Sequence, residues 1–351
     1  MQKVRAEIHL GSIRRNAEKF SALTGKRLCA VVKANAYGHG AEEVVAALSG
    51  RVDCFAVALW EEGLAIRAAA QGKDVLVFTP PLCEEDVYEI GAAGLIASVP
   101  DLYTAKLCVE FCRKFQLSLR VHIKVNTGMN RYGCDVFSLG KLCKYLQANP
   151  CVRVEGLYSH LYTCAQETSF SQRERFVRML AVCKRYFPSL TAHLGATYGA
   201  LLGKEYAFDM LRVGIGLYGY LPDGLQGRAK SVGKALCLEK GMTVYAATAA
   251  VRKYSYGGAG YGVADTEGLK RVSVRRFGYA DGFLRRKENG IAAKKRIQPL
   301  CMDACICKGG RRGVWTPVMM DADEIAKATG TISYEVLCAA TRRAEFVYDY
   351  E

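Results

Sequence analysis

The feature that most constrains the fold of this chain is a repeated alternation along its first two-thirds. Short apolar runs rich in β-branched residues are followed by stretches with apolar residues at helical spacing, such as 61–70 and 102–115. The apolar runs number eight, at residues 28–33, 54–58, 75–79, 95–99, 119–125, 154–159, 190–194 and 211–217. Eight strand–helix alternations predict a parallel (β/α)8 barrel, with a doubly wound open sheet as the alternative.

The pattern changes after about residue 220. A turn signal at 221–224 is followed by β-rich runs that glycine-rich turns separate, at residues 244–251, 272–276 and 344–347. We therefore expect two domains, a barrel over residues 1–224 and a mostly β domain over residues 225–351. The run at residues 4–8 precedes the first barrel unit and is a candidate to pair with the second domain.

Composition and charge narrow the class of protein. The net charge is +15, but the basic residues are scattered and accompany no nucleic-acid-binding motif, so we expect no nucleic-acid partner. No run reaches the ~18 apolar residues of a membrane helix, and the first residues lack the apolar core of a signal peptide. The 15 cysteines include no Cys-x-x-Cys pair, which favours buried thiols in a reducing cytoplasm and no metal site.

The most informative segment is the string VVKANAYGHG at residues 31–40. It places Lys33 where an apolar run ends and a turn of small residues begins. Catalytic groups of a barrel lie at the carboxyl ends of its strands. A lysine flanked by apolar residues at such an end can have its pKa lowered by desolvation and serve as a Schiff-base amine. A lone lysine would more often be an ordinary surface residue that caps a strand.

This string resembles the cofactor-lysine motif of alanine racemases almost residue for residue, and the resemblance extends over essentially the whole chain. That family has a barrel that holds pyridoxal 5'-phosphate, a C-terminal β domain, and a homodimeric assembly with shared active sites. The resemblance implies that Lys33 carries the cofactor. It also implies a cytoplasmic homodimer that acts on a small amino acid.

The segment Ser255-Tyr256-Gly257 is similar to the one that carries the family's second catalytic base. The resemblance implies that Lys33 serves the D face of the substrate, and that Tyr256 of the partner subunit serves the L face. Because tyrosine has a reference pKa of about 10, it needs nearby cations to act as a base near neutrality.

Residues 121–133 resemble a block that binds the substrate carboxylate. In that block an arginine holds the carboxylate and the phenolic oxygen of the cofactor, and a lysine that is often carbamylated positions the arginine. The resemblance implies these roles for Arg131 and Lys124, although this chain has Asn126 where aspartate is more usual. A planar guanidinium suits such a pair of anionic oxygens.

The cofactor contacts implied by the resemblance lie near two further strand ends. His160 would lie against the pyridine ring, and Arg212 would face the pyridine nitrogen. Because arginine does not readily give up a proton, that nitrogen would stay unprotonated, which weakens the ring as an electron sink and favours racemisation over transamination. Backbone amides and hydroxyl groups would bind the phosphate, from Gly214, Ile215, Tyr37, Thr197 and Tyr334. The family usually has Asn-Ser where this chain has Ala196-Thr197.

Three blocks of the β domain, at residues 278–282, 301–303 and 331–335, complete the resemblance. They imply that Tyr279 lies at the active-site entrance, that the Met302 backbone meets the substrate carboxylate, and that Asp303 supports this loop. Tyr334 would crowd the substrate side chain, which favours alanine over serine because a smaller residue there would admit a hydroxymethyl group.

We predict an enzyme that interconverts L- and D-alanine with two bases and thereby supplies D-alanine for peptidoglycan. A serine racemase of the same family, of the kind found in glycopeptide resistance, is the alternative. A decarboxylase with a barrel and a β domain, and a non-catalytic cofactor-binding barrel protein, are the remaining interpretations. The product distinguishes them, because they yield respectively a D-amino acid, an amine with carbon dioxide, or nothing.

Overall fold

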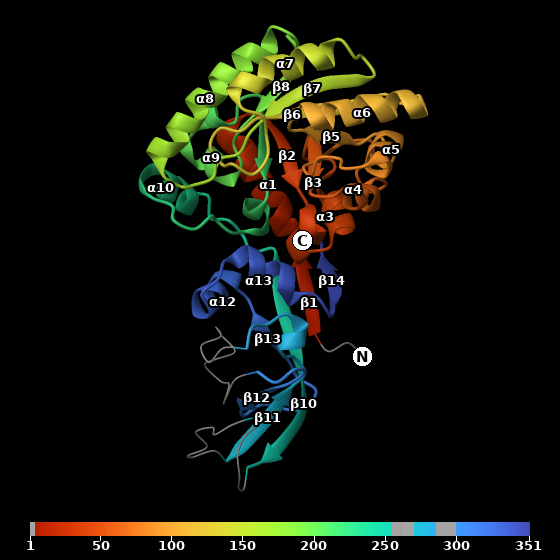
Figure 1. Cartoon of the computed structure of the whole chain (residues 1–351). Helices are drawn as coiled ribbons and strands as arrows, with labels where there is room; N and C mark the ends of the chain where they lie inside the picture. The colour runs from red at the N-terminus through yellow and green to blue at the C-terminus, as the bar shows by residue number, and fades with distance from the viewer. Residues whose placement is uncertain (1–3, 255–260, 262–269, 286–299) are drawn as a thin grey trace.

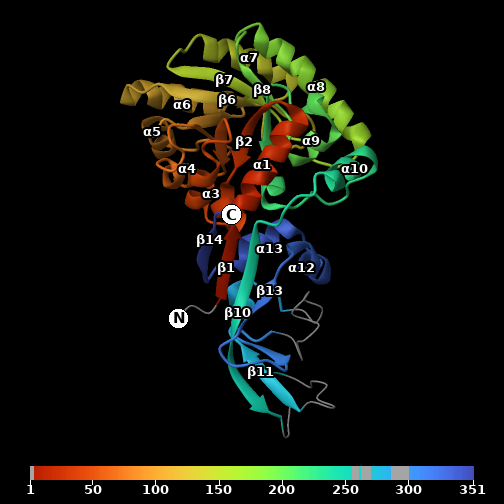
Figure 2. The ribbon, with the colours of Figure 1, turned by 180° about the vertical axis from the view of Figure 1, so that it is seen from behind.

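A computed structural model of the chain describes residues 4–254, 261, 270–285 and 300–351, and Tyr256 therefore lies outside the described residues. The described part forms a barrel and an elongated second domain. Figure 1 shows the barrel at the top and the second domain beneath it. Figure 2 shows from behind that the long strands β1 (Val4–His9) and β10 (Met242–Lys253) run from the junction with the barrel into the second domain.

Eight parallel strands form the barrel, in the order β8-β7-β6-β5-β4-β3-β2-β9. They are β2 (Arg27–Val31), β3 (Cys54–Val57), β4 (Asp74–Val77), β5 (Ile96–Val99), β6 (Leu119–Lys124), β7 (Val152–Tyr158), β8 (Thr191–His193) and β9 (Met210–Val213). Each corresponds to one of the eight apolar runs in the sequence. The predicted barrel, rather than an open doubly wound sheet, is thus confirmed.

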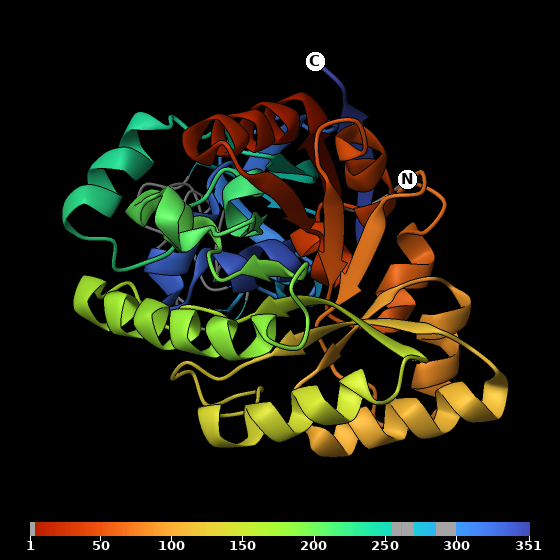
Figure 3. The ribbon, with the colours of Figure 1, turned by 90° about the horizontal axis from the view of Figure 1, so that it is seen from above.

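The two end strands of this order, β8 and β9, meet at the seam of the barrel. Hydrogen bonds near their ends join them, because the Asp209 N–H donates to the Ala192 carbonyl (3.0 Å) and the Arg212 N–H to the Gly195 carbonyl (3.1 Å). Figure 3, a view from above, shows the helices arranged outside these strands. The barrel is therefore nearly closed.

Helices that alternate with the strands cover the outside of the barrel. They are α1 (Leu10–Thr24), α3 (Ala41–Leu48), α4 (Trp60–Ile66), α5 (Glu84–Ala92), α6 (Leu102–Phe115), α7 (Val136–Gln147), α8 (Gln166–Lys184) and α9 (Thr197–Leu202). Helix α6 has the predicted bounds and shows why such segments are helical. Its side of Ala105, Cys108 and Cys112 is buried at a spacing of three and four residues, and the Asp101 carboxylate caps its first turn through the Thr104 N–H (2.8 Å).

The second domain is built on a six-stranded sheet in the order β12-β11-β10-β1-β14, with β13 also paired to β10. Besides β1 and β10, its strands are β11 (Arg271–Arg275), β12 (Cys305–Lys308), β13 (Trp315–Met319) and β14 (Ala344–Asp349). Strand β1 is antiparallel to β10 and parallel to β14, and Ala6 lies opposite both Val244 and Phe346. The amino-terminal strand therefore belongs to the second sheet.

Two helices, α12 (Ala322–Thr329) and α13 (Ser333–Ala340), precede the last strand of this mostly β domain. The sequence analysis did not place them, because it followed β-rich runs and turns in this region. Helix α13 packs against the barrel segment α2 (Lys33–Gly38). At Gly38 a Cβ atom would lie 2.4 Å from the Leu337 carbonyl oxygen, so the close approach of the two domains requires glycine.

The chain leaves the barrel through short helical segments. The 3-10 helices η1 (Lys204–Tyr206) and η2 (Ile215–Tyr218) flank β9, and η3 (Tyr279–Asp281) lies in the second domain. Helix α10 (Gly227–Ala235) packs against α9, so residues just beyond 224 still contact the barrel. Within the described ranges no helix combines the length and the hydropathy that crossing a membrane would require.

Candidate active site

A cavity of about 570 Å³ opens at the carboxyl ends of the barrel strands. Ten of the residues that the sequence analysis selected contribute to its lining. These are Lys33, Tyr37, Lys124, Arg131, His160, Thr197, Arg212, Gly214, Ile215 and Tyr334. All but Tyr334 come from the barrel, where loops after successive strands meet at one end. The fold thus brings together residues that are far apart in the sequence.

Lys33 stands at the start of an unusual turn. The apolar run had predicted that Lys33 ends the strand. Strand β2 instead ends at Val31, and Lys33 is the first residue of segment α2. Residues 34–37 all have φ between 52° and 54°, which makes one left-handed turn. Left-handed backbone costs about 1–2 kcal/mol for each residue with a Cβ atom, so other contacts must hold this turn in place.

The Glu62 carboxylate supplies much of that support. Its Oε1 accepts a hydrogen bond from the Ala34 N–H (2.6 Å), and its Oε2 accepts from the Ala58 N–H (2.7 Å). Glu62 therefore ties the turn that carries Lys33 to the loop after β3. Sequence analysis missed this residue because, although Glu62 stands three positions after the N-cap as in a capping box, the N-cap is Leu59, whose side chain cannot accept a hydrogen bond.

Two neighbouring lysines in the cavity have lowered pKa values. Burial lowers the pKa of Lys33, and the positive charge of Arg131 lowers it further. Lys124 is almost completely buried, and burial, followed by Arg212 and Arg131, lowers its pKa from 10.5 to about 7. Because a neutral amine is a nucleophile and a proton acceptor, both lysines are chemically more reactive than surface lysines.

The loop that carries Arg131 is shaped by Asn126, the residue at which this chain departs from the expected aspartate. The Asn126 side-chain oxygen accepts hydrogen bonds from the Gly128 N–H (2.9 Å) and the Asn130 N–H (3.1 Å). An amide oxygen makes these bonds as a carboxylate would. The substitution thus preserves the turn before Arg131.

Arg212 is held in the barrel interior by groups at the ends of two strands, β7 and β8. Its Nη1 donates to the His193 Nδ1 (2.8 Å), and its Nη2 donates to the Ser159 carbonyl (2.7 Å). Further bonds run to the His193 and Leu194 carbonyls and, at 3.4 Å, to the His160 Nδ1. Within the described residues no acceptor is recorded for its Nε, and the side chain lines the cavity. A rigidly placed cationic donor therefore faces the site.

Tyr158 joins these charged groups from the barrel core, a role that the sequence analysis did not anticipate. Its ring stacks on the His193 ring with 5.1 Å between centroids and 3° between planes. Lys124 Nζ lies 5.0 Å and the Arg212 guanidinium 5.4 Å from the centroid of the Tyr158 ring. Such cation–π contacts partly compensate buried positive charges.

The opposite wall of the cavity is formed by tyrosines and a glycine-rich loop. The Tyr37 ring lies 6.1 Å from that of Tyr334, and a Cβ atom at Gly214 would lie 2.5 Å from the Tyr37 hydroxyl oxygen. The Thr197 hydroxyl accepts from the Gly216 N–H at 3.3 Å. Helix η2 starts at Ile215, where first-turn N–H groups lack partners within the helix. Hydroxyl groups and backbone amides thus converge at one place.

Three selected residues do not line this cavity. Tyr279, Met302 and Asp303 lie together in the second domain, where the Tyr279 N–H donates to the Cys301 carbonyl (3.1 Å). The Asp303 carboxylate accepts from Arg343 (2.8 Å), which also binds the buried Asp281 carboxylate. The Tyr279 and Met302 side chains are 38% and 53% exposed.

A (β/α)8 barrel that presents reactive amines and two arginines to one cavity, followed by a β domain, defines a class of two-domain barrel enzymes for anionic ligands. Comparison with protein families narrows the class. The alanine racemase N-terminal domain family matches residues 8–222, and the alanine racemase C-terminal domain family matches residues 241–348. The chain belongs to the alanine racemase family.

Known proteins resemble the chain over its full length. The alanine racemase of Synechocystis is 31% identical, covering 97% of this chain and 98% of that protein. The structure of the Clostridium difficile enzyme superposes with a TM-score of 0.90 at 26% identity, covering 100% of this chain and 96% of that one. The structure from Bartonella henselae, with covalently bound pyridoxal phosphate, gives a TM-score of 0.83 at 24% identity, covering 99% and 100% respectively.

Proposed function

We propose that this chain is an amino-acid racemase that interconverts L- and D-alanine with pyridoxal 5'-phosphate held on Lys33. The observation that carries the proposal is the placement of Lys33, with its lowered pKa, in one cavity with Arg131 and Arg212 in a chain of this family. The curated relatives matched over nearly the full chain are named alanine racemases.

The residues present fit the cofactor of the family. The Lys33 amine is suited to a covalent link with an aldehyde, because burial disfavours its charged form. The wall of Tyr37, Thr197, Gly214 and Ile215 offers neutral donors of the kind that bind a phosphate. When bound, the cofactor withdraws electrons from the α-carbon of the attached amino acid, which makes the α-proton acidic.

The chain's own groups would then supply geometry and proton transfer. Arg131, which lines the same cavity as Lys33, would hold the substrate carboxylate, and Lys33 Nζ would take or return a proton on one face of the α-carbon. Arg212 cannot easily give up a proton, so a ring nitrogen opposite its Nε would stay unprotonated. His160 lies beside Arg212, and burial and the surrounding cations lower its pKa well below 6.5.

Racemisation requires a second base on the opposite face, and we assign it to Tyr256. Because this residue lies outside the described part, the support comes from the family and from Tyr279 and Met302. These two residues are exposed and do not line the cavity of their own chain. Tyr279 and Met302 would reach an active site if two chains pair so that the second domain of one faces the barrel of the other. The homodimer with shared active sites is thus part of the proposal.

Substrate choice rests on Tyr334. Its half-buried ring lies in the cavity beside Tyr37, where it narrows the space for a substrate side chain. The serine racemase alternative is not favoured, because the matched relatives are alanine racemases. One extra group in a pocket changes specificity by only ~10–200-fold, so slow turnover of serine is expected. A cytoplasmic role in supplying D-alanine for peptidoglycan follows from the same family resemblance.

The direct test is to incubate the purified protein and pyridoxal phosphate with L-alanine or with L-serine and to separate the enantiomers on a chiral column. Fast D-alanine and slow D-serine are expected. Dominant D-serine would show that Tyr334 does not close the pocket. Bound cofactor without either D-product would contradict the assignment of the two bases and bring the decarboxylase or binding-protein interpretation forward.

A further inference from the structure

We propose that His122 is a positioning residue of this active site, which acts through His193 to fix the orientation of Arg212. The inference rests on the proposed function, in which Arg212 faces the ring nitrogen of the cofactor. The His122 side chain lies inside the barrel and lines a cavity at the end opposite to that of Lys33. Neither His122 nor His193 touches the proposed cofactor in this assignment.

Three side chains from three barrel strands form a continuous line of hydrogen bonds. His122 on β6 places its Nδ1 2.9 Å from the Nε2 of His193 on β8. The other nitrogen of His193, Nδ1, lies 2.8 Å from Nη1 of Arg212 on β9. Sequence separation hides this line, because the two histidines are 71 residues apart.

The direction of every bond in this line is set by Arg212. A guanidinium only donates, so the His193 Nδ1 must accept and cannot carry a proton. Neutral His193 then carries its proton on Nε2 and donates it to the His122 Nδ1. Neutral His122 in turn carries its proton on its own Nε2. The donor at Arg212 and the acceptor at His122 therefore favour the same tautomer of His193, each through one ring nitrogen.

Packing keeps both rings in this arrangement. His122 and His193 are 6% and 0% exposed, and burial lowers the pKa of His122 to about 4 and that of His193 well below 6.5, so both are neutral near pH 7. A Cβ atom at Gly156 would lie 2.6 Å from the His122 ring, so glycine makes the room that this ring occupies. Tyr158 stacks on the other ring.

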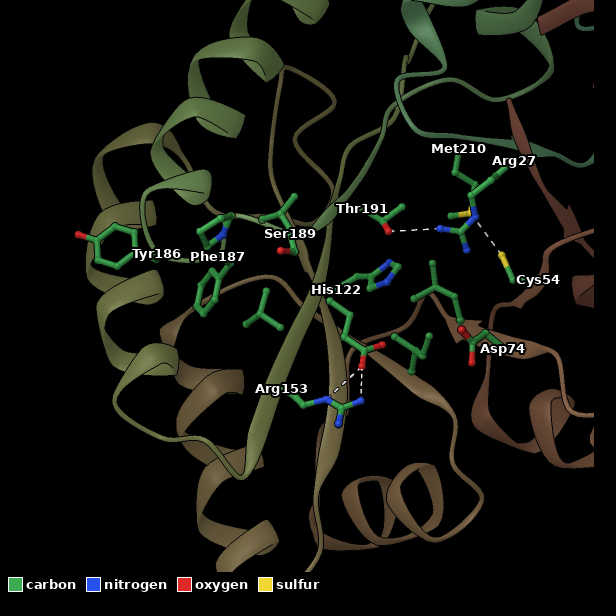
Figure 4. A pocket seen from close by; sticks show the side chains of 16 residues that line it. Arg27, Cys54, Asp74, His122, Arg153, Tyr186, Phe187, Ser189, Thr191 and Met210 are labelled. Atoms are coloured by element: carbon green, nitrogen blue, oxygen red, sulfur yellow. Dashed lines mark hydrogen bonds and ion pairs between the residues drawn. The ribbon is translucent and has the colours of Figure 1, made fainter. Parts of the chain in front are cut away.

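The line begins at a second cavity of about 610 Å³, at the amino-terminal end of the barrel strands. Figure 4 shows His122 among the side chains that line it, with Arg27, Asp74 and Thr191 around it. Charged groups at this end of the barrel form ion pairs with one another. Arg120 binds the Asp74 and Glu155 carboxylates at 2.7 Å each. Among the described residues, His122 Nε2 has no hydrogen-bond acceptor, and the His122 side chain lines this cavity.

Without an acceptor at position 122, the His193 proton loses its partner on Nε2 and is free to move to Nδ1. A proton on Nδ1 would point at the Arg212 donor, and the two groups would repel one another. Arg212 would keep its bonds to backbone carbonyls, including that from Nη1 to the His193 carbonyl, but Nη1 would lose its second acceptor, the His193 ring. A less well-placed arginine would then allow the ring nitrogen to be protonated, which strengthens the electron sink and raises transamination.

Two variants separate hydrogen bonding from packing. In His122→Asn the side-chain oxygen can take the place of Nδ1 and accept from His193, whereas His122→Leu fills similar space without an acceptor. A purely structural role predicts that leucine is tolerated as well as or better than asparagine in this buried position. The proposed role predicts the reverse.

The first measurement is the nitrogen chemical shifts of the imidazoles in the full chain before cofactor is added. Only five histidines are present, so His193 can be assigned by comparison of variants. We expect Nε2 protonated and Nδ1 unprotonated at His193 in the natural chain and in His122→Asn, and a mixture in His122→Leu. A proton on Nδ1 of His193 in the natural chain would overturn the proposal, whatever the variants do.

The second measurement uses the same proteins loaded with pyridoxal phosphate and counts pyruvate formed per D-alanine. In that side reaction alanine and pyridoxal phosphate become pyruvate and pyridoxamine phosphate, and no other reactant is needed. We expect a rise of about tenfold for His122→Leu and less than about twofold for His122→Asn. Equal ratios in the two variants would refute the positioning role. A natural chain that forms no D-alanine would contradict the proposed function alone, because the nitrogen shifts would still decide the bond direction.

Discussion

Replacing the buried Lys124 by methionine should stabilise the folded protein, and the gain should shrink as the pH rises. Lys124 is 7% exposed, and its amine is surrounded by Arg131, Arg212 and the ring of Tyr158. Burial and these cations lower its pKa from 10.5 to about 7. The unfolded chain therefore holds a proton on this amine over a pH range in which the folded chain has lost it.

The magnitude follows from the size of that shift. Each unit of pKa difference corresponds to about 1.4 kcal/mol, so the lysine lowers the free energy of unfolding by about 4 kcal/mol at pH 7. The penalty falls to about 2 kcal/mol at pH 9 and disappears above the unfolded pKa of 10.5. Lys124→Met removes it, since methionine carries no charge.

Urea denaturation at pH 7, 8 and 9 measures the effect. Protomer concentration must be kept constant, because the proposed dimer makes stability depend on concentration. The buffers must also be free of carbon dioxide, because it would react with the neutral Lys124 amine. The gap between the variant and the natural chain should narrow by about 2 kcal/mol from pH 7 to pH 9. Lys141→Met, at an exposed lysine on α7, is the matched control and should show no such trend. Parallel curves for Lys124→Met and the natural chain would refute the argument.

Three further outcomes test other parts of the site. Lys33→Ala should abolish both D-alanine formation and the covalent cofactor adduct seen by mass spectrometry; an adduct on another residue would displace Lys33 from its role. Glu62→Gln replaces one acceptor oxygen by a donor that faces a backbone N–H. It should therefore lower the free energy of unfolding, measured in urea, by about 1–3 kcal/mol and weaken cofactor binding. An unchanged cofactor titration would contradict the role of Glu62 in supporting the turn that carries Lys33. In bicarbonate, the neutral Lys124 amine should add one carbon dioxide and release a proton, visible as a mass gain that Lys124→Met lacks; the same gain in both proteins would place the modification elsewhere.

The barrel could be predicted from local patterns in the sequence, whereas the residues of the cavity were implied by the resemblance to alanine racemases. An apolar run and a helical spacing are each read over about ten residues. The limits of the strands were less certain, and the run at 211–217 combined β9 with the 3-10 helix that follows it. Both pieces are buried, and hydrophobicity alone does not distinguish a buried strand from a buried turn. The close approach of Tyr37 to Gly214 marks where the strand ends.

The missed contributors are residues whose roles depend on distant partners. Glu62 matters because its carboxylate reaches Ala34, 28 residues earlier in the chain. Tyr158 and His193 lie opposite one another on the paired strands β7 and β8, and this pairing stacks their rings. No local pattern distinguishes such a tyrosine or histidine from one that simply fills the core. Helices α12 and α13 of the second domain were not predicted, because each is only eight residues long and lies among β-rich runs.

The position of β1 between β10 and β14 has a consequence for how the chain is synthesised. Strand β1 leaves the ribosome before the barrel does, yet its partner strand β14, with Phe346 opposite Ala6, follows the barrel in the chain. Such non-local pairing slows folding, because a long loop must close before the contact forms. During translation the barrel can close while β1 waits without partners, and its exposed edges are then open to wrong pairing. The sheet of the second domain can therefore be completed only after the whole barrel has been synthesised.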